Sequence, residues 1–407
     1  MKKSTKNIIK SIVVLCFIVL LFDVIYIIYQ KQSNLPESNY FDSVNHYAIS
    51  DHSYIAVGSN NDNDHAYEKA KITKYDEKFN KIWEKFYNRG FNSTFYHVAI
   101  DDDGFVAVGN FQRTKKERSE KTTTALLVKY DEEGKEEFHK TLQILGNSTF
   151  KSVVVVDDGY IAVGQSIYEN STLGMSEEGG AIIVKYDKTG KVLWQDHYGG
   201  NKSGLYNDLV VADDTIYVVG KDYGRVGIIS KYNLDGERLD TKTYQYTDTL
   251  GFTGITQIDD ELVVVGAKKI HEDEYDHDID GLVVKYDYDL DVIDTVIYQD
   301  SGLERFNTVT HDSENNLILV GHQAVLDKRK STKTKNVYQY YGLLAKYKDN
   351  LKEVYVERYG DGNNDYFTNI SIVEDHYLVS GYSKYKKQGY FSKFVTYSPA
   401  GKMLEVK

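Results

Sequence analysis

The chain has 407 residues, of which 41% are hydrophobic and 27% are charged, and its formal net charge is −12. This acidic balance argues against nucleic-acid binding, because phosphate contacts require clustered Lys and Arg in excess. The single Cys excludes an internal disulfide framework and a zinc site built from several Cys ligands.

The N-terminal segment predicts a membrane anchor. Residues 11–30 form an apolar run that is long enough to cross a bilayer as a helix. Its one charge, Asp23, is either tolerated or in contact with a partner helix. The Lys residues within 1–10 keep that end cytoplasmic, and the run lacks the small residues of a cleavage site. We expect a single-pass cell-membrane protein whose remaining chain, after a linker at 31–40, is extracytoplasmic.

From residue 41 onward the sequence repeats one unit. Each unit supplies four short β segments separated by turn residues, and its first segment contains an aromatic residue, Phe41 in the first unit. Seven such units predict an all-β fold, a seven-bladed β-propeller with four-stranded antiparallel blades. The mark of each unit is an apolar run ending in glycine, at Gly58, Gly109, Gly164, Gly220, Gly266, Gly321 and Gly381.

The unit boundaries also predict how the ring closes. The first unit begins with its own inner strand and the last ends with its own outer strand, so both blades are expected to be complete. Closure would then depend on side-chain packing between them. The predicted propeller covers residues 41–407, with blades at approximately 41–90, 91–146, 147–200, 201–247, 248–301, 302–362 and 363–407.

Two segments carry a family resemblance, YGGNKSGLYNDLVVADDTIYVVG at 198–220 and YGDGNNDYFTNISIVEDHYLVSG at 359–381. They resemble the bacterial exported seven-bladed propeller repeats of the SBBP type and, more distantly, quinoprotein-like repeats. The resemblance extends over residues 41–407 and implies a propeller exported to the bacterial cell envelope, without implying an activity. Only Trp83 and Trp194 occur at the quinoprotein-like Trp position, so no quinone cofactor is expected.

Function should depend on the segments that differ between units. Antiparallel order places the loops between second and third strands on the same face as the connections between blades, and these are the long segments. They are either solvated loops or a polar recognition surface with tyrosines as amphipathic contacts. The candidate binding residues on this face are Arg113, Lys115, Lys116, Arg118, Lys328, Arg329, Lys330, Tyr338, Tyr340, Tyr341, Lys386 and Lys387.

One loop suggests a metal ion. Asp276, Asp278 and Asp280 alternate before a glycine, a pattern with which a loop can fold around calcium. The ninth position is the apolar Val284 and the twelfth is Asp287 instead of Glu, so an acidic surface loop is the alternative. No other cofactor is expected.

The sequence contains no nucleophile elbow, P-loop or His-Glu-x-x-His motif. We therefore expect a non-catalytic binding or scaffolding module for a protein or glycan of the cell envelope, with no nucleic-acid partner. The alternative is a carbohydrate-active hydrolase or lyase with its site at the top of the central channel. That alternative requires two or three carboxylates that converge there.

Overall fold

The computed structural model leaves the predicted anchor at 11–30 and the linker at 31–40 outside the residues that it describes. Within the described ranges, no helix is long and apolar enough to span a bilayer. The described residues are 41–61, 67–112, 123–142, 147–167, 179–199, 204–222, 226–244, 249–269, 279–331, 336–360, 362–385 and 389–407.

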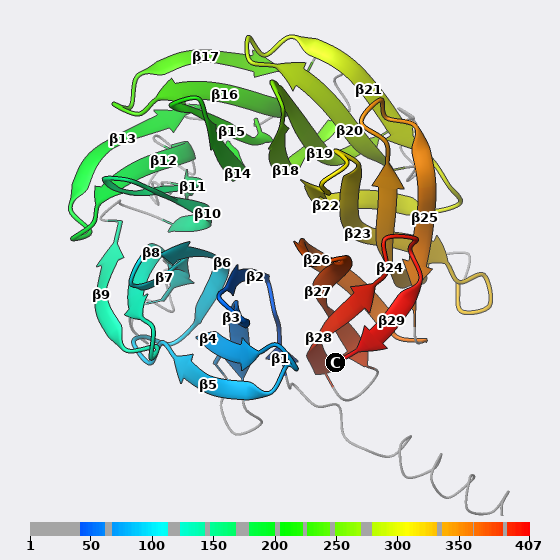
Figure 1. The fold of residues 1–407 in the computed structure, drawn as a ribbon, viewed down its shortest axis with the longest axis horizontal. Coiled ribbons are helices and arrows are strands. Elements are labelled where there is room, and N and C mark those ends of the chain that lie inside the picture. The colour runs from blue at the N-terminus through cyan, green and yellow to red at the C-terminus, as the bar shows by residue number, and fades with distance from the viewer. Residues whose placement is uncertain are drawn as a thin grey trace, which may run out of the picture.

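The described chain is all-β, and its sheets stand around a common axis as the blades of a β-propeller (Figure 1). This confirms the predicted propeller fold. Consecutive strands pair antiparallel, so each blade is a contiguous stretch of the chain. The N-terminal blade contains β1 (Phe41–Asp42), β2 (His46–Ser50), β3 (Ser53–Asn61), β4 (Lys69–Asp76) and β5 (Lys81–Phe86).

The following blades each contain four strands, from the inner strand near the axis to the outer edge. The next two contain β6 (Ser93–Asp101), β7 (Gly104–Phe111), β8 (Thr124–Asp131) and β9 (Glu136–Thr141), then β10 (Asn147–Val156), β11 (Gly159–Ile167), β12 (Gly179–Asp187) and β13 (Val192–Tyr198). After them come β14 (Leu205–Ala212), β15 (Thr215–Lys221), β16 (Gly227–Asn233) and β17 (Arg238–Thr243), then β18 (Thr249–Ile258), β19 (Glu261–Lys269), β20 (Ile279–Asp287) and β21 (Val292–Tyr298). The last two contain β22 (Leu303–His311), β23 (Leu317–Leu326), β24 (Tyr338–Tyr347) and β25 (Glu353–Tyr359), then β26 (Asn364–Val373), β27 (His376–Tyr385), β28 (Gly389–Tyr397) and β29 (Met403–Val406).

The repeated glycine is required by the close approach of the first strand to the second. A Cβ atom on Gly109 would lie 1.8 Å from the carbonyl oxygen of Thr94, and one on Gly164 would lie 1.9 Å from that of Thr149. Neither glycine has the positive φ that an L side chain avoids. The repeat therefore selects glycine for the space between two strands.

The aromatic residue opposite this glycine is a wedge between blades. Phe252 lies over Gly227 of the preceding blade, and Phe306 lies over Gly281 in the same way. In the N-terminal blade the expectation of Phe41 at this position is wrong. The buried Val44 takes the place, because the second-strand glycine of that blade faces the carbonyl of the residue before Val44. The fully buried wedges of the other blades are Phe95, Phe150, Tyr206, Phe252, Phe306 and Phe367.

The ring closes through backbone pairing as well as side chains. The N-terminal and C-terminal blades are each built from consecutive strands, as expected. The expectation that side-chain packing alone joins them is wrong, because β1 pairs in parallel with β28 through Phe41 and Tyr390. Side chains then reinforce the junction: Asn369 donates a 3.0 Å hydrogen bond to the carbonyl of Tyr47.

Both blades at this junction contain a buried ion pair at the same place. Lys71 pairs with Asp42 in the N-terminal blade, and Lys393 pairs with Asp365 at 2.8 Å in the C-terminal blade. Each lysine lies directly opposite the repeated glycine of its blade, and each aspartate lies two residues before the wedge position. Burial alone would lower the pKa of Lys393, but the hydrogen bond to Asp365 reverses the shift and the pKa is raised.

Candidate functional site

The structure places half of the predicted binding residues. Those it describes lie on the hairpin of β23 and β24, whose register continues outward to the pair Leu326 and Tyr338. At its turn, Arg329 is 93% exposed and Lys330 pairs with Asp327. Outside the described residues lie Arg113, Lys115, Lys116, Arg118, Lys386 and Lys387, together with Asp276 and Asp278 of the predicted calcium loop.

The hairpin tyrosines do not act as one group. The ring of Tyr340 lies 4.9 Å from that of Tyr366, on the neighbouring blade, and 6.1 Å from that of His322. Tyr341 points to the other side of its strand, where its ring packs beside Gly360. Tyr340 therefore joins an aromatic cluster that spans two blades, while Tyr341 lies outside that cluster.

Two members of that cluster, His322 and Tyr366, belong to a feature which we call the rim. The rim comprises the residues directly before and after the wedge position on each first strand and directly after the glycine on each second strand. The strand register sets these positions at one level, for example Thr94 opposite Asn110. They lie at the strand ends that lead into the second-to-third loops, so the rim is on the long-loop face.

The rim carries positive charge without any acidic residue, although Asp and Glu outnumber Lys and Arg by 61 to 49 in the chain. Its charged residues are Lys151, Lys221 and Arg305. The rim residues before the wedge are Ser43, Thr94, Thr149, Leu205, Gly251, Arg305 and Tyr366. The rim residues after the wedge are Asn45, Tyr96, Lys151, Asn207, Thr253, Asn307 and Thr368. The rim residues after the glycine are Ser59, Asn110, Gln165, Lys221, Ala267, His322 and Tyr382.

Most rim residues after the wedge fasten one blade to the next. Asn45 donates a 2.7 Å hydrogen bond to the carbonyl of Phe95, and Asn207 donates one of 2.6 Å to the carbonyl of Phe252. Lys151 departs from this pattern. Its Nζ lies 3.7 Å from the ring centroid of Tyr96, and burial, with a smaller contribution from Lys221, lowers its pKa to about 8.

The opposite part of the rim combines Arg305 with aromatic rings. Burial, and then the charge of Arg305, lowers the pKa of His322 to about 4, so this imidazole is neutral at pH 7. The ring of His322 lies 5.3 Å from that of Tyr366, which stacks at 5.0 Å on Tyr382. Burial also lowers the pKa of Arg305. The result is a partly desolvated guanidinium beside a row of tyrosines.

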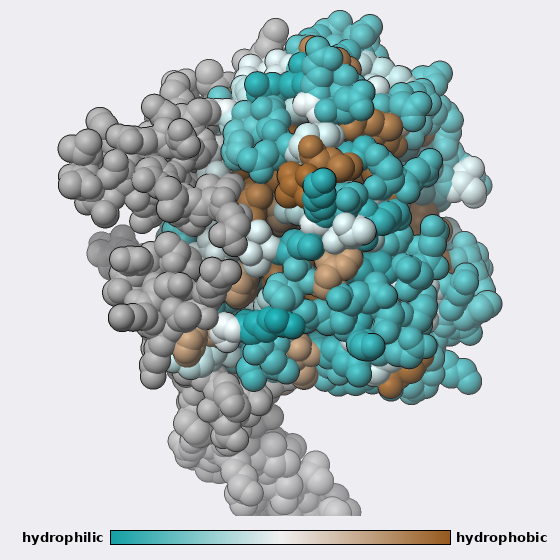
Figure 2. Space-filling model, turned by 90° about the vertical axis from the view of Figure 1, so that its left-hand side faces the viewer, coloured by the Kyte–Doolittle hydropathy of each residue, from teal (hydrophilic) through white to brown (hydrophobic). Residues whose placement is uncertain are grey.

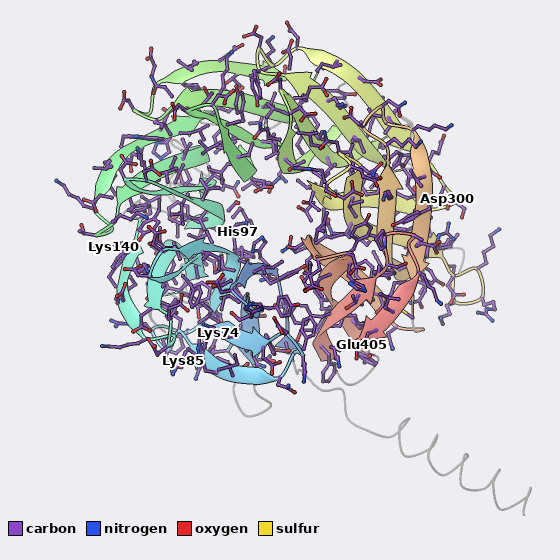
Figure 3. All side chains as sticks on the ribbon, viewed as in Figure 1. Lys74, Lys85, His97, Lys140, Asp300 and Glu405 are labelled. Carbon is purple, nitrogen blue, oxygen red and sulfur yellow. The ribbon has the colours of Figure 1, made fainter. Side chains whose placement is uncertain are left out.

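We call the residue two places after the wedge on each first strand the inner position. The polar side chains at the inner positions are neutral or hydrogen-bonded. His46 and His97 stack with centroids 3.6 Å apart, and burial lowers the pKa of His97 to about 3. His97 lies at the inner edge of its blade, toward the middle of the ring (Figure 3). At the same depth, Asp208 accepts a 2.8 Å hydrogen bond from Ser152, and burial raises its pKa to about 6.

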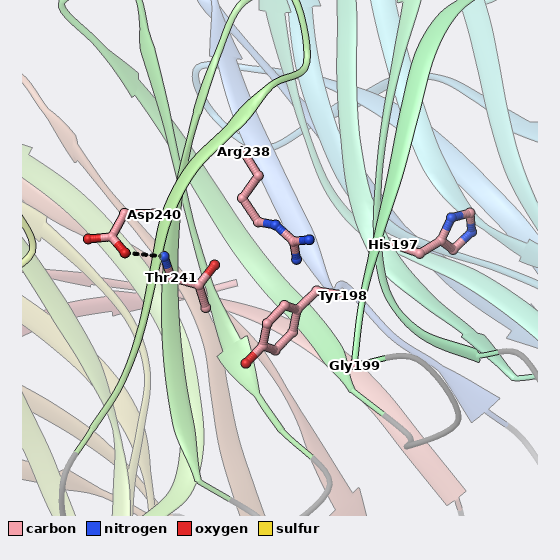
Figure 4. Close-up of a pocket in the computed structure, with 6 residues that line it drawn as sticks. All are labelled: His197, Tyr198, Gly199, Arg238, Asp240 and Thr241. Atoms are coloured by element: carbon pink, nitrogen blue, oxygen red, sulfur yellow. Dashed lines mark hydrogen bonds between the residues drawn. The ribbon is translucent and has the colours of Figure 1, made fainter.

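Two pockets lie away from the rim. The pocket in Figure 4, of about 420 Å³, lies between the outer strands β13 and β17, and the Arg238 guanidinium sits 5.3 Å from the Tyr198 ring centroid beside it. A second pocket, of about 400 Å³, is lined by Tyr54, Phe79 and Leu378 at the junction of the first and last blades.

On the side of the propeller drawn in Figure 2 the surface is mostly hydrophilic with separate apolar patches. Exposed apolar residues of the outer strands include Val192, Leu193 and Leu239.

Sequence patterns alone missed the rim. Its signal was nevertheless present, because the residues flanking the constant wedge and glycine change their chemistry from unit to unit. The prediction relied on loop length and loop charge, and it therefore selected residues of the long loops instead. The rim residues that it missed are Tyr96, Lys151, Lys221, Arg305, His322, Tyr366 and Tyr382.

The chain matches no family model and no curated protein sequence. Among solved structures, it is similar to a prolyl endopeptidase with a TM-score of 0.52 and 12% identity, over 93% of this chain and 53% of that one. It thus spans about half the length of that endopeptidase. The polysaccharide lyase Uly1 is similar with a TM-score of 0.51 and 10% identity, over 87% of this chain and 89% of that one. The propeller domain of the trilobed protease from Pyrococcus furiosus is similar with a TM-score of 0.47 and 10% identity, over 90% of this chain and 95% of that one. The first two similarities show a shared fold alone.

Proposed function

We propose that the chain is a membrane-anchored, extracytoplasmic propeller of seven blades that binds an acidic glycan of the bacterial cell envelope at its rim. The observation that carries the proposal is the rim itself, where Lys151, Lys221 and Arg305 occur without any acidic residue in an otherwise acidic protein. An anchor at 11–30 would hold this face close to the polymers of the envelope.

The chemistry of the rim fits this ligand class. Partly desolvated cations attract carboxylate, sulfate or phosphate groups more strongly than cations in bulk water do. Tyr366 and Tyr382 present amphipathic rings of the kind that pack on sugar faces, with hydroxyl groups for hydrogen bonds. Because the rim is built on paired strands, little conformational entropy is lost when a ligand binds.

The predicted loop residues take a secondary role in this proposal. Lys328 and Arg329 at the hairpin turn are exposed, so a contact with them is weakened by solvent screening. They would add long-range attraction for an anionic polymer around the rim. The basic residues of 113–118 and 386–387 lie outside the described residues, and under this proposal they would act in the same way.

The proposal is tested by titrating the full chain with a polyuronate and with its carboxyl-reduced, neutral counterpart in a calorimeter. We expect binding of the polyuronate, weakening about 10-fold between about 50 and about 200 mM salt because bound counterions are released. The neutral polymer should bind at least 10-fold more weakly. Equal binding of both polymers, or a specific protein partner with no polyuronate binding, would contradict the proposal.

A polysaccharide lyase is the second candidate, and the pairing of His322 with Arg305 favours it. In such a reaction a base takes the proton beside the uronate carboxyl, a carbon–carbon double bond forms, and the bond to the leaving oxygen breaks as that oxygen takes a proton from water. Neutral His322 would accept the proton, and Arg305 would balance the carboxylate charge. Ultraviolet absorbance of the unsaturated product distinguishes the two candidates.

A hydrolase would need a second carboxylate beside Asp208, and the described rim and inner positions supply none.

Binding should depend on pH through Lys151. Its pKa is lowered to about 8 in the free protein, and a bound anion raises that pKa in the complex. Affinity is therefore full below about pH 8 and falls as the pH rises through the pKa of the complex. Comparing dissociation constants at about pH 7 and pH 10 measures this loss. Lys151→Arg should remove most of it, because guanidinium stays charged. An unchanged pH profile in that variant would exclude Lys151 as the titrating group.

A further inference from the structure

A buried carboxylate at the junction of two blades has no ion-pair partner among the described residues, whereas its equivalents in the first and last blades each have a lysine. Glu304 lies at the start of β22, two residues before its wedge, and is 0% exposed. Its Oε1 accepts a 2.6 Å hydrogen bond from Nε2 of Gln323, which is also 0% exposed. Neither Oε2 of Glu304 nor Oε1 of Gln323 has a hydrogen-bond partner among the described residues.

The same position in other blades shows what is missing. Asp42 and Asp365 occupy it in the first and last blades, and a lysine opposite the repeated glycine neutralises each of them. In the β22–β25 blade, the residue opposite Gly321 is the apolar Leu343. No lysine therefore reaches Glu304 from that position.

A second carboxylate adds to the negative charge. Asp280 on β20 is 1% exposed and lies next to Ile279, which pairs in parallel with Leu303, the residue before Glu304. Burial, together with the negative charges of Asp280 and Asp300, raises the pKa of Glu304 to about 7, although the hydrogen bond from Gln323 acts to lower it. Two carboxylates and an amide oxygen thus meet where the β18–β21 and β22–β25 blades join.

We propose that a calcium ion binds at this junction, held by Asp280, Glu304 and Gln323. Carboxylate and amide oxygens are the ligands of hard cations, and calcium tolerates irregular coordination completed by water. The ion would supply the positive charge that lysines supply in the first and last blades, and it would join two blades. This site differs from the predicted calcium loop, which combined Asp280 with Asp276 and Asp278.

The proposal is tested on the full chain after removal of divalent ions with a chelator. Titration with CaCl2 should give one site per chain, with a dissociation constant of about 10⁻⁴ to 10⁻³ M, as in extracellular calcium modules. MgCl2 should bind more weakly, because magnesium demands a regular octahedron. Calcium should also raise the denaturant midpoint.

Glu304→Gln removes a charge at nearly constant shape and should weaken calcium binding at least 10-fold. The matched control Glu314→Gln, an exposed carboxylate of the same blade, should leave it within 2-fold.

Three results would overturn the proposal. The first is a wild-type chain whose stability and heat signal do not respond to calcium, since no ion would then bind at this junction. The second is calcium binding by Glu304→Gln as tight as by the wild type, which would place the ion elsewhere. Leu343→Lys tests the same idea by another route. It should abolish the calcium response and raise the stability in chelator, because its ammonium takes the place of the ion; a retained response would also overturn the proposal.

Discussion

Replacing Lys151 and Arg305 together by Ala is expected to weaken the binding of a polyuronate at least 100-fold. A hydrogen bond to a charged group contributes about 1.5–3 kcal/mol, so each single replacement should cost about 10-fold or more. The two residues lie on different blades, β10–β13 and β22–β25, so their effects should be nearly additive. Calorimetry at one salt concentration measures the loss, and circular dichroism checks that the sheet content is retained.

The hairpin turn provides the matched comparison for this experiment. A triple replacement of Lys328, Arg329 and Lys330 by Ser removes more positive charge than the rim variant does. Because these side chains are exposed or paired with Asp327, we expect only a 2- to 3-fold loss, mainly in the association rate. A larger loss in the triple variant than in the rim variant would move the binding site from the rim to the hairpin.

The second large effect concerns stability. Lys393→Met should lower the free energy of unfolding by about 3–5 kcal/mol, because it leaves Asp365 as a buried carboxylate without its cation. Denaturant unfolding followed by tyrosine fluorescence measures the change. The exposed Lys402, in the same blade, gives the control variant Lys402→Met, which should stay within about 0.5 kcal/mol of the wild type.

A double variant separates the charge from the lost packing. In Lys393→Met with Asp365→Asn no net charge remains buried, so most of the lost stability should return. A cost below about 1 kcal/mol for Lys393→Met alone, or no recovery in the double variant, would show that this ion pair does not stabilise the closing blade.

The repeat could be predicted from the sequence because it follows from local structural requirements. The glycine that leaves room for the neighbouring strand, the buried wedge and the tyrosine that ends the third strand have the same role from blade to blade, so they recur at regular intervals. The N-terminal blade was the exception. Phe41 has the right residue type, but it pairs with β28, and Val44 fills the wedge position.

The ring junction could not be read from order along the chain. Whether β1 reaches β28, and whether Asp42 is neutralised by Lys71, depends on how residues far apart in the sequence meet in space. Tyr340 and Tyr341 show the same limit at the hairpin. They are adjacent in sequence, yet only Tyr340 joins the aromatic cluster, because neighbours on a strand face opposite sides.

The sequence by itself determined the class of fold, the acidic balance and the antiparallel order of the strands within each blade, because composition, period and strand alternation are local properties. The tertiary structure alone decided which residues act together. The approach of Lys151 to Tyr96, of His322 to Arg305, and of Glu304 to Asp280 arises only when separate strands or blades are brought side by side. Burial then sets the charge of these groups, and burial is a property of the packed ring.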